Sequence, residues 1–310
     1  MEVIKPMDPI LKSNFIKDKE WIHQVKWDGI RGITFIDKKS VNVFTKNGKN
    51  TTENYPELKE LSKLLKGKKA ILDGEIIVLS KGEKPSFKHS LIRQKVSNKN
   101  RLNFYMKKYP IKYIVFDMLM IDNNDIRDFP YIERKEKLNE KLNENEKIAI
   151  TEDFNNGEKL FELMKKRSWE GIVSKRLSSK YVPGKKHNDW YKIKITRKIL
   201  AIVLGVELKK DNPKSLILGL YKKGEINYIG KASIGLNEKE KNLIKEYIPK
   251  LKGGDFSKFN LKGSIIYFKT FITCWVKFME WTYDGLLRNP RIIGFSDIDY
   301  KKALGRETIL

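Results

Sequence analysis

The sequence predicts an α+β protein in two parts: a larger domain of strands and helices over residues 1–196, and a smaller β-barrel over residues 197–310. Three observations predict this division. Apolar runs with the two-residue period of strands alternate with helical segments through the first two thirds of the chain. From about residue 199, short strands separated by turn residues follow one another, with one helix among them. A polar link, residues 196–198, lies between the two patterns.

Charge is the most unusual feature of the composition. The 310 residues include 64 Lys and Arg against 39 Asp and Glu, a formal net charge of +25. Residues 1–195 hold 42 basic against 27 acidic residues, and residues 196–310 hold 22 against 12, so the excess runs through both parts. Such a balance favours a polyanionic partner, most simply nucleic acid. A lysine-rich proteome, in which Lys coats every surface, accounts for the charge equally well.

The composition also excludes several classes of protein. Cys274 is the only cysteine, which excludes an intramolecular disulfide framework and the ligand spacing of a zinc site. No apolar run reaches transmembrane length, and the first residues do not resemble a signal peptide. The expectation is therefore a soluble, cytoplasmic, monomeric protein that has no membrane partner.

The stretch around Lys26 is the first candidate for chemistry. A strand-like run, residues 21–25, precedes it, Asp28-Gly29 follows as a turn signal, and a second alternating run covers residues 33–36. This pattern predicts a hairpin with Lys26 at a strand end. A lysine amine is a covalent nucleophile once it loses its proton, and a nearby cation such as Arg31 favours that loss. The other interpretation is a hairpin whose Lys and Arg are solvated at its rim.

Carboxylates interrupt an apolar run farther along the chain. After an expected strand at 41–45 and a helix at 56–65, residues 70–79 predict a buried strand pair that carries Asp73 and Glu75. An apolar strand does not bury carboxylates unless they have partners, so these two indicate a site. The other interpretation is that Asp73-Gly74 is only a turn and Glu75 faces solvent.

The same pattern recurs before the polar link. Residues 111–119 predict a strand, and two helices are expected at 133–142 and 160–167. The next apolar strand begins after Glu170, and a basic loop that includes Lys185 follows it. Residues 189–194 alternate, which places Lys192 and Lys194 on one face of a strand. Segments 87–93 and 102–109 have an ambiguous pattern.

The last third predicts a small barrel. Short strands are expected at 199–207, 215–221, 226–232, 263–269 and 273–281, and a helix at 238–247. Five short strands and one helix are typical of the oligonucleotide-binding type of barrel, the OB-fold, which binds single strands or grooves.

Six short motifs occur in a fixed order along the chain. They are residues 26–31 (Lys-Trp-Asp-Gly-Ile-Arg), 45–48 (Thr-Lys-Asn-Gly), 73–75 (Asp-Gly-Glu), 113–119 (Tyr-Ile-Val-Phe-Asp-Met-Leu), 170–175 (Glu-Gly-Ile-Val-Ser-Lys) and 190–194 (Trp-Tyr-Lys-Ile-Lys). In this order they resemble the motifs of covalent nucleotidyltransferases, the superfamily of DNA ligases, RNA ligases and mRNA capping enzymes. One motif is a weak signal, whereas six in order are specific.

Two C-terminal segments make the resemblance more specific than the six motifs do. Residues 278–282 and 287–295 are similar to the closing part of bacterial ATP-dependent DNA ligases. The group that the chain resembles is the ligase portion of bacterial end-joining ligase–polymerase proteins and their stand-alone relatives. The resemblance implies a nucleotidyltransferase domain with ATP-grasp-like antiparallel sheets, followed by an OB-fold. It also implies a cytoplasmic protein associated with a bacterial nucleoid, or one encoded by a phage.

The resemblance implies an ATP-dependent DNA ligase. Such an enzyme seals 5′-phosphate/3′-hydroxyl nicks through a covalent lysyl-AMP intermediate, in DNA repair or end joining. Its cofactors are ATP and Mg²⁺ or Mn²⁺, and hard oxygen ligands suit these metals. Its partners are double-stranded DNA with nicks or ends and, in end joining, a Ku-like or repair-polymerase protein.

The resemblance also implies roles for individual residues, with Lys26 as the nucleophile. The residues implied to bind ATP are Gln24, Val25, Arg31, Lys46, Glu75, Phe116, Lys192 and Lys194. In this set Gln24 and Val25 select adenine through the backbone, Phe116 stacks on it, and the cations surround the phosphates. Glu75 and Glu170 are implied as metal ligands, Glu75 also as a contact to the ribose. Lys185, Arg288 and Arg291 are implied to support the first step and to contact DNA.

Two positions depart from the family pattern. Lys46 stands where the family usually has an arginine, and a lysine cannot make the bidentate contacts of a guanidinium. After Phe295 the family usually has an Arg-x-Asp-Lys ending, whereas this chain has Ser-Asp-Ile-Asp at 296–299. Because that ending supports the first step in the family, we expect slow self-adenylylation unless Arg288 and Arg291 compensate.

Three other functions fit part of the pattern. A capping guanylyltransferase shares the Lys-x-Asp-Gly motif but uses GTP and usually carries Thr at the position of Trp27. An RNA ligase shares the motifs, and these do not reveal the sugar of the substrate. A non-catalytic nucleic-acid binder could have the same fold, but it has no need for Lys26, Glu75 and Glu170 together.

Overall fold

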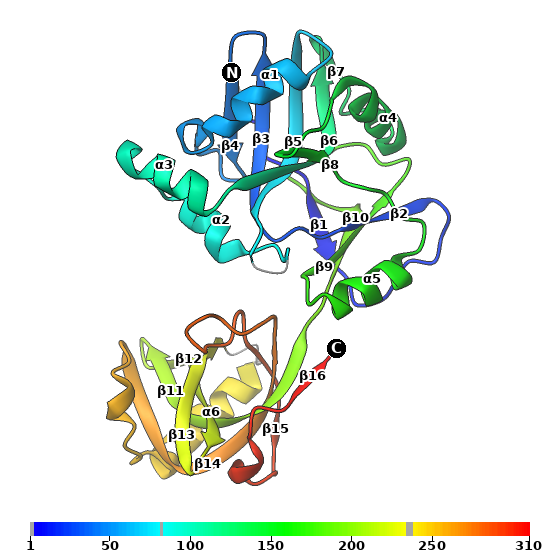
Figure 1. Cartoon of the computed structure of the whole chain (residues 1–310). Helices are drawn as coiled ribbons and strands as arrows, with labels where there is room; N and C mark the ends of the chain where they lie inside the picture. The colour runs from blue at the N-terminus through cyan, green and yellow to red at the C-terminus, as the bar shows by residue number, and fades with distance from the viewer. Residues whose placement is uncertain (1–2, 81–82, 234–237) are drawn as a thin grey trace. The chain divides into compact units, whose positions relative to one another are not determined.

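The computed structural model describes residues 3–80, 83–233 and 238–310 (Figure 1). The chain divides into two compact units, Met1–Lys194 and Ile195–Leu310. The last strand of the first unit ends at Lys194 and the first strand of the second begins at Arg197, so the polar link is shorter than expected. In the described part of the chain, no helix combines the length and apolar character needed to cross a bilayer.

The first unit contains two sheets that are mostly antiparallel. The order in the larger sheet is β4 (Val41–Thr45), β3 (Ile30–Asp37), β5 (Lys69–Val78), β6 (Ile111–Ile121) and β7 (Asn124–Asp125), with β8 (Ile148–Ile150) parallel to β6. The order in the smaller sheet is β1 (Asp8–Leu11), β10 (Lys186–Lys194), β9 (Gly171–Arg176) and β2 (Trp21–Val25), with β1 parallel to β10.

Helices pack on both sheets of this unit (Figure 1). They are α1 (Leu61–Leu64), α2 (Phe87–Gln94), α3 (Lys99–Lys108), α4 (Tyr131–Lys141) and α5 (Gly157–Lys166), and 3₁₀ turns cover Thr52–Asn54 and Pro56–Glu60. The α2 helix contacts β5 and β3, whereas α5 contacts β2 and β9. The two segments with an ambiguous sequence pattern are thus the helices α2 and α3. The expected helix at 56–65 is mostly 3₁₀, and only its last turn is α-helical.

The predicted hairpin around Lys26 is wrong. β2 pairs with β9 in the smaller sheet, whereas β3 pairs with β4 and β5 in the larger sheet. The chain therefore crosses from one sheet to the other at Lys26. The Asp28-Gly29 signal does mark a break between strands, but tertiary pairing decides which strands become neighbours, and short sequence patterns do not contain that information.

The predicted strand pair at 70–79 is also wrong, because this stretch is one strand. β5 runs through Asp73 and Gly74 without turning and pairs with β3 on one side and β6 on the other. The register against β6 shifts between Asp73 and Gly74. A Cβ at Gly74 would lie 2.6 Å from the carbonyl oxygen of Ile114, so this glycine permits close approach of the neighbouring strand instead of a turn.

A fully buried ion pair lies behind the larger sheet. Arg134 on α4 donates to both carboxylate oxygens of Asp117 on β6, at 2.8 and 2.9 Å. It also donates to the carbonyl oxygens of Phe129 and Ser179, at 2.6 and 2.8 Å. Both charged side chains are 0% exposed. The bonds of Arg134 therefore fix α4 and the chain near Ser179 against the strand that carries Phe116.

The second unit is a small closed barrel with one helix. Its strand order is β12 (Asn212–Lys222), β13 (Glu225–Ser233), β15 (Arg291–Ser296), β14 (Ser264–Phe278), β11 (Arg197–Lys209) and β16 (Glu307–Ile309). Pairing of β12 with β11 closes the ring. The helix is α6 (Glu238–Leu251), and 3₁₀ turns cover Ser257–Phe259 and Tyr300–Lys302. Buried apolar residues of the strands, with Ile248 of α6, form one core in this unit, and the middle of β11 is buried on both of its faces.

The barrel confirms the expected fold class and corrects two of its strands. The strands expected at 263–269 and 273–281 are one long strand, β14, which pairs with β11 on both sides of an irregularity at residues 268–271. The segment at 287–295, noted only for its motif, ends in the strand β15. The α+β class with an OB-like second unit is therefore present, although the strand boundaries differ.

The buried ion pair supports a stability prediction. We expect Arg134→Leu to lower the free energy of unfolding of the first unit by about 3–5 kcal/mol, because Asp117 would keep a buried charge without its partner. Urea unfolding followed by circular dichroism measures the loss. The double variant Arg134→Leu, Asp117→Leu removes both charges and should recover much of the stability. An unchanged urea midpoint in the single variant would contradict the prediction.

Candidate active site

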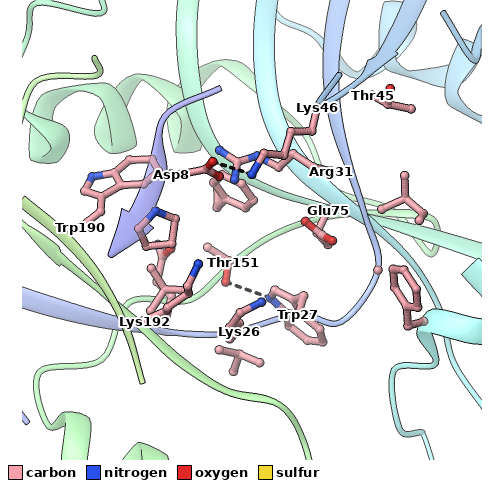
Figure 2. Close-up of a pocket in the computed structure, with 18 of the residues that line it drawn as sticks. Asp8, Lys26, Trp27, Arg31, Thr45, Lys46, Glu75, Thr151, Trp190 and Lys192 are labelled. Atoms are coloured by element: carbon pink, nitrogen blue, oxygen red, sulfur yellow. Dashed lines mark hydrogen bonds and ion pairs between the residues drawn. The ribbon is translucent and has the colours of Figure 1, made fainter. Parts of the chain in front are cut away.

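A cavity of about 500 Å³ lies where the two sheets of the first unit meet (Figure 2). The residues that line it come from both sheets, from α2 and from the loops between them. Those expected from the sequence that line it are Gln24, Val25, Lys26, Arg31, Lys46, Glu75, Phe116 and Lys192. Figure 2 shows Lys26, Glu75 and Lys192 turned toward one another across this cavity.

Lys26 leaves β2 directly into a cluster of charges. Its backbone N–H donates to the carbonyl oxygen of Gly171 at 2.9 Å. Its Nζ lies 2.7 Å from one oxygen of Glu170, and the Nζ of Lys194 lies 2.9 Å from the other oxygen. The Glu170 side chain is only 5% exposed. One buried carboxylate thus holds two lysines, which come from different strands of the smaller sheet.

Two glycines permit this close arrangement. Gly171 has a φ of +138°, and a Cβ there would lie 2.1 Å from the carbonyl oxygen of Ile193 on β10. A Cβ at Gly29 would lie 2.3 Å from the carbonyl oxygen of Ile76 on β5. Any side chain at either position would push these strands apart. The glycines of the two motifs therefore bring Glu170 and Lys26 to their positions beside the cavity.

The charge state of Glu170 follows from its neighbours. Burial opposes ionisation of this carboxyl, but the charges and hydrogen bonds of Lys26 and Lys194 outweigh burial and hold its pKa below the usual value. Burial, with the charges of Lys26 and Lys194, lowers the pKa of Lys192. The cluster is thus an ionised carboxylate that pairs with Lys26 and Lys194, with the charge of Lys192 close to both lysines.

Glu75 has the opposite environment. It lies partly buried on β5 at the cavity, and burial is the largest influence on its carboxyl. Lys26 and Arg31 favour its ionisation, Glu170 and Asp28 oppose it, and the pKa rises to about 8. At neutral pH, Glu170 is therefore ionised and Glu75 is mostly protonated, although both lie near Lys26.

Asp73 has the charged and hydrogen-bonding partners that were expected for a carboxylate in an apolar strand. Arg31 donates Nε and Nη2 to the two oxygens of Asp73, both at 2.5 Å, and Tyr181 donates its hydroxyl to Asp73 at 2.6 Å. Burial alone would lower the pKa of Arg31, but Asp73 raises it overall. The guanidinium carbon lies 4.6 Å from the centre of the Phe116 ring. Arg31 is thus held in the wall of the cavity behind an aromatic ring.

Lys175 is a lining residue that the sequence analysis did not select. It is 1% exposed, donates to the carbonyl oxygen of Phe116 at 3.1 Å, and lies 4.2–4.7 Å from the rings of Phe116, Tyr131 and Trp190. Burial lowers its pKa to about 7. The available signal was a charged residue that follows the apolar pair Ile172-Val173 in a strand, an argument similar to the one that selected Asp73 and Glu75.

The side chain of Gln24 is bound behind the cavity. Its Nε2 donates to the Tyr131 hydroxyl at 2.7 Å and to Asp153 at 2.6 Å, and only 2% of the residue is exposed. The Gln24 side chain is thus held by other protein groups, and Gln24 and Val25 both border the cavity. Trp27, which was considered only as a family marker, also lines the cavity and donates to Thr151 at 3.3 Å (Figure 2).

Of the other expected residues, Lys46 lines the cavity, whereas Lys185, Arg288 and Arg291 do not. Lys46 borders the cavity and pairs with Asp8 at 2.5 Å (Figure 2). Lys185 lies in the loop before β10 and does not line the cavity. Arg288, which pairs with Glu280 at 2.8 Å, and Arg291 at the start of β15 belong to the second unit. Their roles toward the nucleotide remain predictions.

Comparison with protein families decides the identity of the chain. A family model described as the ATP dependent DNA ligase domain matches residues 4–194, and one described as the ATP dependent DNA ligase C terminal region matches residues 209–297. The chain belongs to the ATP-dependent DNA ligase family. This confirms the resemblance that the six motifs indicated, and it places the cavity in the ligase domain.

Curated relatives point to the same group of ligases. The multifunctional non-homologous end joining protein LigD of Mycobacterium bovis is 29% identical over 285 residues, which are 88% of this chain and 36% of that protein. The bifunctional non-homologous end joining protein LigD of Bacillus subtilis is 27% identical over 309 residues, 93% of this chain and 48% of that protein. The chain thus spans less than half the length of these two relatives.

Solved structures share the fold. The ligase domain of LigD from M. tuberculosis is 24% identical, with a TM-score of 0.53, over 97% of this chain and 98% of that chain. A Lig E DNA ligase is 18% identical, with a TM-score of 0.63, over 94% of this chain and 99% of that chain. At these sequence identities, the similarity shows that the chain shares the fold of these structures, and it does not assign roles to individual residues.

The residues at the cavity fit a divalent metal only in part. Glu75 and Glu170 offer hard oxygen ligands beside the cavity, as Mg²⁺ prefers. Among the described residues, no group of three or more His, Cys, Asp or Glu could hold a metal ion. This donor set suits Mg²⁺ bound through one or two carboxylates together with substrate phosphates, which is the usual arrangement for that ion.

The raised pKa of Glu75 predicts a pH dependence of stability. Between the ordinary value of 4.5 and about 8, the folded ligase holds a proton that the unfolded chain has released. The stability associated with this proton is therefore complete below pH 4.5 and is lost as the pH rises through 8.

Glu75→Gln should remove this part of the pH dependence. Urea midpoints of wild type and variant, measured between about pH 5 and 7, isolate the contribution of Glu75, because Lys175 titrates mainly above that window. We expect the wild-type midpoint to fall with pH relative to that of the variant. If the urea midpoints of wild type and Glu75→Gln changed with pH in parallel, the Glu75 carboxyl would already be ionised in this pH range.

Proposed function

We propose that this chain seals 5′-phosphate/3′-hydroxyl nicks in double-stranded DNA through a covalent lysyl-AMP intermediate on Lys26. The observation that supports the proposal is the position of Lys26 at a cavity between two sheets, beside a buried carboxylate and further lysines. A solvated surface lysine needs none of these neighbours. The arrangement suits a group that must be oriented toward a phosphate and that must exchange a proton.

The first proposed step transfers AMP to the protein. Lys26 Nζ, after losing its proton, attacks the α-phosphorus of ATP, so that a P–N bond forms and the P–O bond to the β-phosphate breaks. Pyrophosphate leaves with the bonding electrons. Such transfers depend on in-line positioning and on neutralising phosphate charge. Lys46, Lys192 and Lys194, which lie at or next to the cavity, would supply positive charge for this purpose.

The adenine would lie against the aromatic wall. Phe116 is 9% exposed and lines the cavity, with Arg31 and Lys175 packed around its ring. These cations fix the ring from behind and leave its exposed part for stacking. The backbone at Gln24 and Val25 would form the hydrogen bonds that distinguish adenine from guanine.

Glu170 and Glu75 are the proposed metal ligands, with Glu75 also near the ribose. A bound Mg²⁺ would neutralise charge on the phosphates and would compete with Lys26 for the carboxylate of Glu170. Release of Lys26 from Glu170 would free its amine for attack.

The later steps use DNA. The 5′-phosphate at a nick displaces Lys26 from the α-phosphorus, which regenerates the lysine and gives a DNA-adenylate. The 3′-hydroxyl then attacks the 5′-phosphorus, and AMP leaves as the phosphodiester forms. Lys185 in the basic loop, with Arg288 and Arg291 in the second unit, is proposed to contact the nucleic acid. The net charge of +25 is consistent with a polyanionic substrate.

The names of the relatives suggest the biological process in which the proposed reaction takes part. The two relatives described above are named for non-homologous end joining. We therefore place the activity in repair or end joining in the cytoplasm, with a Ku-like or repair-polymerase protein as the partner. These assignments concern the proposed biological setting and do not alter the chemistry at Lys26.

The covalent intermediate is directly testable. Wild-type protein incubated with Mg²⁺ and ATP labelled at the α-phosphate should acquire label that resists denaturation, and Lys26→Ala should acquire none. Lys159→Ala, a change at an exposed lysine of α5, serves as the matched control and should label normally. Mass spectrometry should locate the adenylate on Lys26.

The same assay separates the competing functions. Label from GTP in place of ATP would indicate a capping enzyme. A Lys26→Ala protein should still close a nick that already carries the DNA-adenylate, because the last step does not use the lysine. Absence of label from folded, AMP-free wild-type protein would overturn the proposal, unless closure of the pre-adenylylated nick locates the defect in the first step.

Glu170 provides a second test. Glu170→Gln keeps the size of the side chain but weakens its hold on Lys26, Lys194 and the metal, so we expect self-adenylylation to slow about 100-fold, as for a misplaced catalytic group. The Mg²⁺ concentration for half-maximal rate should also rise. Glu207→Gln is the matched control, since Glu207 is a lysine-paired carboxylate in the second unit. A normal rate with Glu170→Gln would remove Glu170 from the mechanism.

A further inference from the structure

The segment from Lys84 to Phe116 is strongly basic and contains no acidic residue. Its basic residues are Lys84, Lys88, Arg93, Lys95, Lys99, Arg101, Lys107, Lys108 and Lys112. The structure folds this segment into the helices α2 and α3, which pack against each other on one side of the first unit (Figure 1). No carboxylate within the segment balances this positive charge. None of the nine basic residues has a role in the chemistry proposed for the cavity.

The helix pair is firmly attached to the unit. Arg93 on α2 is 0% exposed and donates Nη2 to Glu57 at 2.7 Å. Asn54 donates Nδ2 to the carbonyl oxygen of Val96 in the turn between the helices, at 2.7 Å. The rings of His89 and Tyr109 stack at 4.6 Å, which joins α2 to the end of α3. A buried cation and two tertiary contacts thus hold these helices as a rigid platform.

The two helices present different faces. α2 turns Phe87, Leu91 and Gln94, one helical stripe, to the nucleotide cavity. α3 exposes Arg101, Lys107 and Lys108, and between them Phe104, which is 60% exposed with Lys108 Nζ 5.5 Å from its ring centre. The pair therefore connects the cavity to an outer surface of cations and one aromatic ring. We call Arg101, Phe104, Lys107 and Lys108 the α3 face.

We propose that the α3 face binds the phosphate backbone of duplex DNA next to the nick. This inference rests on the proposed function, because the cavity beside α2 would supply the AMP that the 5′-phosphate receives. Duplex DNA carries about one negative charge per 1.7 Å, and a ten-residue helix is about 15 Å long, so α3 can meet several phosphates. The segment itself contributes no acidic side chain that would repel a polyanion from this face.

The choice of duplex over other partners follows from the residues. Three cations on a rigid helix match regularly spaced phosphates, and such contacts position a nucleic acid without reading its sequence. A protein partner would instead require a larger apolar area than one exposed ring. The α3 face would add backbone contacts on the first unit to those expected from Lys185.

The test is a triple variant, Arg101→Gln, Lys107→Gln, Lys108→Gln, in the full chain. Glutamine preserves helix propensity while removing the charges. We expect the Kd for a nicked duplex to rise about tenfold or more at physiological salt, and the slope of log K against log salt to become shallower by about 2.7 for three lost phosphate contacts. Fluorescence anisotropy of a labelled nicked duplex in EDTA, which prevents turnover, measures both quantities.

The matched control removes three charges from another helix of the same unit. Lys159→Gln, Lys165→Gln, Lys166→Gln on α5 lowers the net charge equally, so it should change Kd and salt slope far less if the α3 face is the contact. If the two variants changed Kd and the salt slope equally, net charge alone would account for the result, and the inference would be overturned. An unchanged Kd and slope in the α3 variant would also overturn it.

A separate measurement distinguishes this inference from the proposed function. Self-adenylylation of the α3 variant without DNA should match that of wild type, because none of the three residues lines the cavity. Wild-type protein that never adenylylates would defeat the proposed function, whatever the binding data show. Normal adenylylation with unaltered DNA binding in the α3 variant would defeat the α3 face alone.

Discussion

The buried carboxylate of Glu170 is the constraint on which the site depends. It lies at the start of β9 and holds Lys26 from the end of β2 and Lys194 from the end of β10, so one ion cluster joins three strands of the smaller sheet. A carboxylate that is 5% exposed is stable in its ionised form only with such partners. Lys26 therefore has a defined position before any substrate arrives, and release of this contact is part of the proposed chemistry.

A second cluster of charges shapes the other wall of the cavity. Asp73 holds Arg31 and accepts from Tyr181, and Arg31 in turn lies over the ring of Phe116. Lys175 approaches the same ring from the smaller sheet. These contacts fix an aromatic side chain at the meeting point of the two sheets. The cavity is thus assembled from buried polar interactions, which impose directions on side chains that apolar packing alone does not impose.

The helix pair α2–α3 extends this arrangement outward. One stripe of α2 borders the cavity, while the buried Arg93 holds the helix to the rest of the unit. The cations of α3 then lie on the same rigid support as the cavity wall. In the proposed function, binding of a long polyanion and chemistry on its end would be linked through this pair of helices.

The sequence by itself determined the α+β class, the barrel at the end of the chain and the residue types at the site. Apolar periodicity predicts strands because it follows from burial of one face, and Asp73, Glu75 and Glu170 stood out because an apolar strand does not bury carboxylates without partners. The order of six motifs was sufficient to indicate the family. These inferences depend on local pattern, and local pattern is what a sequence contains.

Only the tertiary structure decided which residues meet. It separated β2 from β3 into different sheets, where the sequence predicted a hairpin, and it paired Asp73 with Tyr181, 108 residues away. It also raised the pKa of Glu75 and lowered that of Glu170, two carboxyls of the same expected role. Strand pairing and burial arise from contacts between distant segments, so no local pattern specifies them. The physical reason is that a side chain's charge and reactivity depend on its neighbours in space, and these are set by the fold.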